Sequence, residues 1–252
     1  MISKNKLKEL AAYRQQKRCD EEGVFVVEGP RLCAEALRSG FRIRVVCATG
    51  EWGEESGERR EECGEWYEVS QGELERLSGM QSPNRVWMLV ERKEGDESDG
   101  CVGGDVREAP VLALDRVQDP GNMGTMLRTA DWFGIRRVVC SRDTVSCYNA
   151  KVVQASMGAI FRTRVDYVDL PQWLEGCGMP VIGASLQGQP LGEARLPEGA
   201  CVLLIGNEGR GISAEAMAQV THPVLIPNIG GTAESLNAAV AAGILMHYLS
   251  LR

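Results

Sequence analysis

The stretch 201–213 reads CVLLIGNEGRGIS, and the stretch 224–243 reads VLIPNIGGTAESLNAAVAAG. Within them, the apolar runs Val202–Ile205 and Val224–Ile226 have the length and composition of buried strands. Each run is followed by a polar loop rich in glycine, a residue that lets the main chain come close to a ligand. Ligands bind at the carboxyl ends of strands in α/β sheets. The two loops are therefore predicted to form one binding site.

A third motif lies upstream, at 114–130, and reads LDRVQDPGNMGTMLRTA. In this order the motifs resemble those of the SpoU (TrmH-like) branch of the SPOUT RNA methyltransferases, and the resemblance covers most of the chain after Pro110. It implies an α/β catalytic domain with a parallel sheet and a deep trefoil knot. It also implies S-adenosylmethionine as cofactor, methyl transfer to a ribose 2′-hydroxyl of RNA, and a homodimer formed through the catalytic domain.

The resemblance also assigns site residues by their positions in the motifs. The implied catalytic residues are Arg128, Asn122, Glu208, Ser235 and Asn237. The implied cofactor-binding residues are Gly206, Ile226, Leu236, Ala184, Ser185, Ile205 and Asn207. Without the resemblance, Ile226 and Leu236 would be interpreted as core residues and Arg128 as part of a surface ion pair.

The resemblance and the local sequence suggest how these residues act. A guanidinium is always protonated, so Arg128 is expected to hold a phosphate and polarise the 2′-hydroxyl, whether or not it takes the proton. Asn122 is expected to orient Arg128 or to cap a helix over Met123–Phe133. Glu208 is expected to anchor Arg128 or a nearby main-chain amide. Ser235 and Asn237 are both candidates for the N-cap of the last helix, and the resemblance implies that both lie near the target nucleotide and Arg128. Ser235 at least is expected to have both roles.

Two departures from the family pattern lie in the third motif. Asn228 follows Pro227 where the family often has methionine. The loop Asn228–Ala233 is also slightly longer than the common form. Cofactor contacts in this loop are therefore left open.

The chain is predicted to divide into a substrate-binding domain over 1–92, a linker over 93–108 and a catalytic domain over 109–252. The beginning, with a strand, a Glu28-Gly29 turn, a helix and a second strand, resembles a small α/β domain found before many SpoU domains. That domain is similar in fold to ribosomal proteins that bind kinked RNA. The segment Lys93–Val106 is polar and rich in glycine, which is typical of a flexible linker.

Periodicity predicts strands and helices in alternation, hence α/β domains with a largely parallel second sheet. By pattern alone the second domain would be Rossmann-like. Helices are expected over Lys4–Gln16, Arg31–Ser39, Glu73–Leu77, Met123–Phe133, Ala150–Met157 and Leu170–Gly176. Strands are expected over Val24–Gly29, Ile43–Cys47, Trp66–Val69, Arg85–Glu91, Val111–Leu114, Arg137–Cys140, Arg162–Tyr167 and Val181–Ala184. Glu51–Glu65 is expected to be an exposed loop.

The net charge of −7 argues at first sight against an RNA partner. Basic residues outnumber acidic ones up to Arg44, however, and local basic patches steer a polyanion more than net charge does. A solvated helix face is the alternative interpretation of these charges. The 9 cysteines form no CxxC pair and only 2 histidines are present, so neither a metal site nor disulfides are expected.

No apolar run is long enough to span a bilayer and no secretory signal is visible, so we expect a cytoplasmic protein that does not bind membranes. The predicted function is 2′-O-methylation of rRNA, with tRNA less favoured because an N-terminal substrate module precedes the catalytic domain. A non-catalytic RNA-binding or ribosome assembly factor on the same fold is the alternative. A Rossmann oxidoreductase is disfavoured because no GxGxxG follows the strand ending at Leu114.

Overall fold

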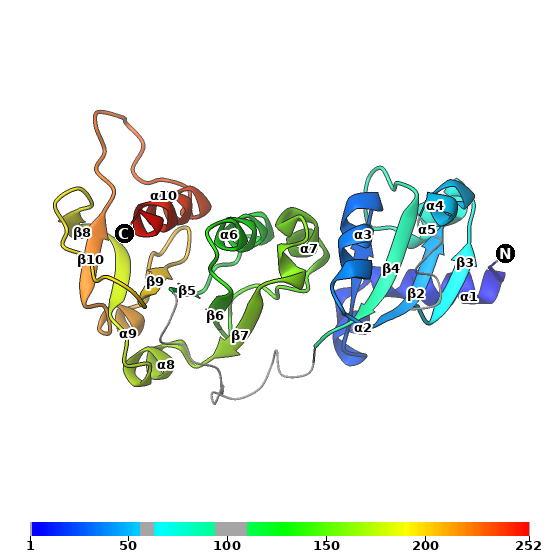
Figure 1. The fold of residues 1–252 in the computed structure, drawn as a ribbon, viewed down its shortest axis with the longest axis horizontal. Coiled ribbons are helices and arrows are strands. Elements are labelled where there is room, and N and C mark those ends of the chain that lie inside the picture. Colours follow the sequence, from blue (N-terminus) through cyan, green and yellow to red (C-terminus); the bar gives the residue numbers. More distant parts are fainter. Residues whose placement is uncertain (1, 56–62, 94–109, 252) are drawn as a thin grey trace. The chain divides into compact units, whose positions relative to one another are not determined.

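The computed structural model describes residues 2–55, 63–93 and 110–251, which form two compact units (Figure 1). The first unit contains Met1–Glu94 together with Tyr148–Phe161, and the second contains the remainder. The predicted linker 93–108 lies outside the described residues except for Lys93. The domain limits 1–92 and 109–252 therefore stay predictions.

The first unit is built on a sheet of four strands in the order β1-β4-β2-β3. The strands are β1 (Val24–Glu28), β2 (Ile43–Ala48), β3 (Glu65–Glu68) and β4 (Val86–Glu91). β4 is antiparallel to both neighbours, while β2 and β3 are parallel. The helices are α1 (Lys4–Ala11), η1 (Ala12–Arg14), α2 (Gln16–Glu21), α3 (Pro30–Arg38), α4 (Gly50–Glu55) and α5 (Gln71–Leu77).

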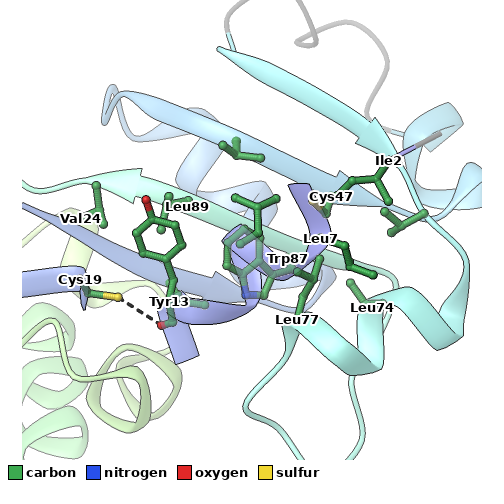
Figure 2. Packing of buried hydrophobic residues seen from close by; sticks show 14 residues of the cluster. Ile2, Leu7, Tyr13, Cys19, Val24, Cys47, Leu74, Leu77, Trp87 and Leu89 are labelled. Carbon is green, nitrogen blue, oxygen red and sulfur yellow. Dashed lines mark hydrogen bonds between the residues drawn. The ribbon is translucent and has the colours of Figure 1, made fainter. Parts of the chain in front are cut away.

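Figure 2 shows the core on one face of this sheet, where Trp87 of β4 lies among leucines of α1 and α5. The predicted single helix over Lys4–Gln16 is wrong, since α1 ends at Ala11 and a 3₁₀ turn follows. Tyr13 explains the break, because the turn buries its ring in this core while its hydroxyl donates to Glu22 at 2.6 Å. The other face is covered by α3 and by α7 (Ala150–Ser156).

The predicted exposed loop over Glu51–Glu65 is wrong in its first part. Helix α4 begins there, and Trp52 is only 3% exposed. The Trp52 ring stacks on Trp66 with 5.8 Å between ring centroids. Burial of one large aromatic ring outweighs the glycine- and glutamate-rich composition on which the loop prediction rested.

The second unit is built on a sheet of six strands, all parallel, in the order β10-β8-β9-β5-β6-β7. The strands are β5 (Val111–Leu114), β6 (Arg137–Ser141), β7 (Arg164–Val168), β8 (Val181–Pro190), β9 (Val202–Ile205) and β10 (His222–Leu225). The helices are α6 (Pro120–Trp132), α8 (Leu170–Gly176), α9 (Ala214–Met217) and α10 (Ala238–Ser250). The short 3₁₀ turn η3 (Ala159–Phe161) belongs to the first unit.

The strand order separates this sheet from a Rossmann sheet. In a Rossmann sheet the fourth strand along the chain lies beside the first. Here β9, the fifth strand of the unit, lies beside β5, and β8 lies outside it. The pattern-based Rossmann interpretation is therefore wrong in topology, although a parallel α/β sheet is confirmed. The trefoil knot stays a prediction.

The β10 end of the sheet differs from the predicted strands. The second apolar run does form a strand, but β10 is an edge strand that ends at Leu225 and only Val224 in it is buried. The predicted burial of the run and its extension to Ile226 are therefore wrong. β8 runs on to Pro190, and its pairing with β10 jumps from Gly183 to Gln189. The segment 184–188 therefore bulges out of the ladder at the carboxyl edge.

Candidate active site

The first two motifs meet where β5 and β9 lie side by side. Leu114 of β5 pairs with Ile205 of β9, and beyond this last pair the loops that follow the two strands diverge. The side-chain amide of Asn207 bridges the divergence by donating to the Arg116 carbonyl oxygen at 2.7 Å. A point of this kind, between diverging loops at the carboxyl ends of strands, is the usual ligand position in an α/β sheet.

The loop after β9 is closed on itself. Asn207 exchanges main-chain hydrogen bonds of 3.0 and 2.9 Å with Gly211, and its Oδ1 accepts from the N–H groups of Gly209 and Arg210. A Cβ added to Gly206 would lie 2.2 Å from the main chain of Gly211. The close approach that requires Gly206 is therefore to the loop's own main chain.

Helix α6 begins one turn earlier than predicted. Asp119 is the N-cap, with its Oδ1 accepting from the Asn122 N–H at 2.7 Å, and Pro120 is the first helical residue. The prediction that Asn122 caps a helix starting at Met123 is wrong. The Asp-Pro pair was the missed signal, because aspartate favours the N-cap and proline the position after it. Asn122 lies inside the first turn, and its side chain is free for other partners.

Asn122 joins all three motifs by hydrogen bonds. Its Nδ2 donates to Glu208 Oε1 at 3.0 Å, and its Oδ1 accepts from Asn237 Nδ2 at 2.9 Å. The same Glu208 oxygen accepts from the main-chain N–H of Asp119 at 3.3 Å. Glu208 thus anchors a main-chain amide, which is one of the two predicted possibilities.

The direction of this network follows from donor and acceptor chemistry. Asn237 Oδ1 accepts from Ala239 and Val240 N–H as the N-cap of α10, so its amide nitrogen is left to face Asn122. Asn122 must then present its oxygen to Asn237 and its nitrogen to Glu208, whose ionised carboxylate only accepts. Each bond therefore fixes the orientation of the next amide.

Two of the predicted catalytic residues lie outside the network. Arg128 is exposed on α6, and its side chain makes no hydrogen bond or ion pair with Asn122, with Glu208 or with any other described residue. The contacts of Arg128 with Asn122 or Glu208 that the sequence predicted are therefore not formed. Ser235 is exposed in the loop, and its expected capping role is wrong because α10 begins at Ala238, after Asn237.

The predicted cofactor residues come from three neighbouring strands and the loops that follow them. Ile205 and Gly206 lie at the end of β9, Asn207 follows, Ala184 and Ser185 lie in the bulged part of β8, and Ile226 follows β10. Leu236, just before the α10 cap, is 49% exposed, so its interpretation as a core residue is wrong. Leu186 beside Ser185 is 71% exposed. Exposed apolar side chains at one sheet edge fit the apolar contact that the base of an adenosine needs.

Sequence reasoning missed Arg116 as a support of this edge. Arg116 adopts a left-handed φ of 58°, which is uncommon outside glycine. Its N–H donates to Ser141 Oγ at 2.8 Å, and its Nε lies 3.4 Å from Oδ1 of the buried Asp115. The other Asp115 oxygen accepts from the Ser213 N–H at 2.6 Å. An arginine in such a turn carries no sequence signal of its conformation.

Residues 2–55, 63–93 and 110–251 contain neither a group of metal ligands nor a helix that could cross a membrane. No three histidine, cysteine, aspartate or glutamate side chains there are grouped so that they could hold a metal ion. No helix in the same residues has the length and apolar character needed to cross a membrane.

Comparison with known proteins identifies both parts of the chain. Residues 109–247 match the SpoU rRNA Methylase family, and residues 4–87 match the MRM3-like substrate binding domain. The 23S rRNA (guanosine(2553)-2′-O)-methyltransferase RlmP of Bacillus subtilis (strain 168) is 31% identical over 249 residues, covering 97% of this chain and 95% of that protein. A 23S rRNA (guanosine-2′-O-)-methyltransferase RlmB of Pseudomonas aeruginosa is 31% identical over 223 residues, covering 83% of this chain and 78% of that protein.

Solved structures agree. A putative RNA methyltransferase of the TrmH family from Porphyromonas gingivalis superposes with a TM-score of 0.86 at 37% identity, covering 99% of this chain and 98% of that one. An AdoMet-bound rRNA methyltransferase from Sinorhizobium meliloti superposes with a TM-score of 0.83 at 27% identity, covering 99% and 95%. The three motifs, the strand order and these matches lead to one assignment: the chain belongs to the SpoU rRNA methylase family.

Proposed function

We propose that this protein transfers a methyl group from S-adenosylmethionine to a ribose 2′-hydroxyl of ribosomal RNA. The observation that supports this most directly is the Asn122–Glu208–Asn237 network, which joins the three motifs at the carboxyl edge of β5 and β9. The matched relatives are named as rRNA 2′-O-methyltransferases, and none of those reported above is named as a non-catalytic assembly factor.

S-adenosylmethionine, when bound, supplies an electrophilic methyl group. The cofactor would be held by Ile205, Gly206 and Asn207 after β9, by Ala184 and Ser185 in β8, and by Ile226 and Leu236 around the third-motif loop. These residues would contribute mainly by orienting the methyl group toward the ribose hydroxyl. Orientation of two reacting groups can correspond to effective molarities of ~10⁵ M or more.

Arg128 is the residue that we assign to the RNA. Its exposed guanidinium would bind a phosphate next to the target ribose through paired N–H groups and polarise the 2′-hydroxyl. Asn122, Glu208 and Asn237 would hold the first turn of α6 and the start of α10 at a fixed separation. Ser235, exposed just before this junction, would contact the target nucleotide.

We further propose that the protein acts as a homodimer through the second unit. Helices α6 and α10 pack together and leave Trp132, Val240 and Ile244 exposed at 84%, 51% and 38%. Large apolar side chains exposed on neighbouring elements are typical of a protein interface. The first unit, by its match to a substrate-binding domain, would hold the rRNA, and a protein that modifies rRNA would work in the cytoplasm with the ribosome.

The test is methyl transfer from labelled S-adenosylmethionine to total RNA that lacks 2′-O-methyl marks, with Arg128→Ala as the control. Label at one ribose of rRNA, lost in the variant, is the expected result and names the target. Label only in tRNA would overturn the substrate assignment. Absence of label with every RNA, from a folded protein that binds RNA, would favour the assembly-factor alternative.

A further inference from the structure

In the third-motif loop, the side chain of Asn228 makes all of its hydrogen bonds to the main chain of the same loop. Asn228 Oδ1 accepts from the N–H groups of Gly230 at 3.0 Å and Gly231 at 2.7 Å. Its Nδ2 donates to the carbonyl oxygens of Gly231 at 3.0 Å and Ala233 at 3.2 Å. An asparagine side chain has two acceptor positions and two donor hydrogens, so these bonds use its whole capacity.

The loop needs such support because little else orders it. All residues from Pro227 to Asn237 are exposed, and two glycines stand next to each other within this segment. Glycine loses more conformational freedom on ordering than any other residue. Gly230 has φ of +137°, a conformation that other residues rarely adopt. The Asn228 amide thus replaces the packing that an exposed loop lacks.

The loop also sets the separation of two predicted cofactor residues. Ile226 lies just before it and Leu236 just after it, and Asn237 then joins the network with Asn122. Pro227 has a fixed φ and no N–H, so the chain cannot adjust freely at its entry. The shape of residues 228–233 therefore decides where Ile226 and Leu236 stand relative to each other.

We propose that Asn228 is a positioning residue for the cofactor: its amide holds the loop 228–233 in the shape in which Ile226 and Leu236 receive S-adenosylmethionine. This inference rests on the proposed function. It also gives a physical reason for the two departures from the family pattern. The loop 228–233 is longer than the common form, and Asn228, at the position where methionine is common, stabilises it by hydrogen bonds.

The experiment compares wild type with Asn228→Met, Asn228→Asp and Gly230→Ala. The probe is S-adenosylhomocysteine, whose dissociation constant is measured by calorimetry, together with hydrogen exchange of the loop amides and kcat and KM for S-adenosylmethionine. Asn5→Met is the matched control, because it makes the same change at an exposed asparagine of α1.

Asn228→Met is expected to weaken binding about tenfold or more and to raise KM in parallel, with kcat at saturation unchanged, since it removes all four bonds. Asn228→Asp keeps the two acceptor contacts and is expected to fall between wild type and Asn228→Met. Gly230→Ala should behave like Asn228→Met, because it disfavours the positive φ of Gly230 and so disturbs the same loop while the Asn228 side chain stays in place.

Wild-type affinity in Asn228→Met, or a fall in kcat with unchanged affinity, would overturn the inference while leaving the proposed function intact. Failure of the wild-type protein to bind the probe would instead overturn the cofactor assignment on which both stand.

Discussion

Asn237 and Asn122 are 115 positions apart in the sequence, yet the Nδ2 of the first donates to the Oδ1 of the second at 2.9 Å. This bond ties the start of α10 to the first turn of α6. Asn237 also caps α10, and Asn122 also donates to Glu208 in the loop after β9. A change in either amide therefore affects the first turn of α6, the loop after β9 and the start of α10. A side-chain network of this kind transmits the loss of one member to the others.

Asn122→Ala is accordingly expected to lower kcat by about 10²-fold, since small misplacements of positioning groups cost that much. Asn122→Asp should be worse, because it places a second carboxylate against Glu208. Single-turnover methyl transfer is the measurement. Asp169→Ala, which removes the N-cap of α8 outside the site, is the control and should keep its rate. Equal rates for Asn122→Ala and Asp169→Ala would contradict a positioning role for Asn122.

Gly206 and Gly209 offer a matched pair within one loop. A Cβ at position 206 would lie 2.2 Å from the Gly211 main chain, whereas a Cβ at 209 would meet only an Asn207 side-chain oxygen at 3.8 Å. Gly206→Ala is therefore expected to lower the melting temperature of the second unit by several degrees, roughly the effect of 1–3 kcal/mol of overpacking. Gly209→Ala should leave the melting temperature nearly unchanged. Similar melting temperatures for both variants would argue against the closed form of this loop.

Arg116 allows the strain of a left-handed residue to be separated from its ion pair. Arg116→Ala and Arg116→Gly both remove the contact with Asp115, but only glycine adopts a φ of 58° without a steric cost. Arg116→Gly is expected to be more stable than Arg116→Ala by about 1 kcal/mol in urea unfolding. The reverse order would show that the left-handed turn is not formed in solution.

The strands around the site were largely predictable from sequence, and its side-chain contacts were not. Val202–Ile205 and Leu170–Gly176 have the predicted limits, because short apolar runs and helical spacing are local signals. The position of β9 beside β5 is not local, since it depends on which strand the chain inserts into the middle of the sheet. Periodicity carries no information on that choice.

The site shows the same division between local and non-local information. The motifs predicted Asn122, Glu208 and Asn237 as site residues, and the structure brings these three side chains together. Their partners could not be read from sequence, because each bond spans more than eighty positions. Capping is a local property, yet the predicted cap Asn122 lies inside α6, whose N-cap is Asp119. Of the two capping candidates before α10, Ser235 and Asn237, only Asn237 is the cap, since several residues near a helix start can serve.

Glu28 predicts a pH dependence for the first unit. It is 7% exposed and accepts from the Ser78 hydroxyl and, at 3.2 Å, from the Gly79 N–H. Burial raises its pKa above the ordinary value, an effect that these hydrogen bonds and Arg14 reduce but do not cancel. The folded state therefore holds a proton more tightly than the unfolded state does, so this group stabilises the fold less as the pH rises through the raised pKa.

The measurement is the melting temperature of wild type and Glu28→Gln between the ordinary glutamate pKa of about 4.5 and pH 7. The glutamine of Glu28→Gln cannot ionise. The melting temperature of wild type should therefore fall relative to that of Glu28→Gln as the pH increases. Other carboxylates titrate alike in both proteins and cancel in the comparison. A difference that stays constant across this range would show that the folded-state pKa of Glu28 is not raised.

The exposed apolar side chains of α6 and α10 predict how the second unit associates. Val240 and Ile244 lie one helical turn apart on α10, at 51% and 38% exposed, and Trp132 is 84% exposed at the end of α6. A charge among these side chains should prevent a second copy from packing there, because an unpaired buried charge is costly. Val240→Glu is expected to convert a dimer into a monomer in sedimentation velocity, and Trp132→Ala should weaken the dimer. Leu186→Glu, at an exposed leucine of β8 outside these helices, is the control and should sediment as wild type does. A Val240→Glu protein that remains a dimer would place the interface on another surface.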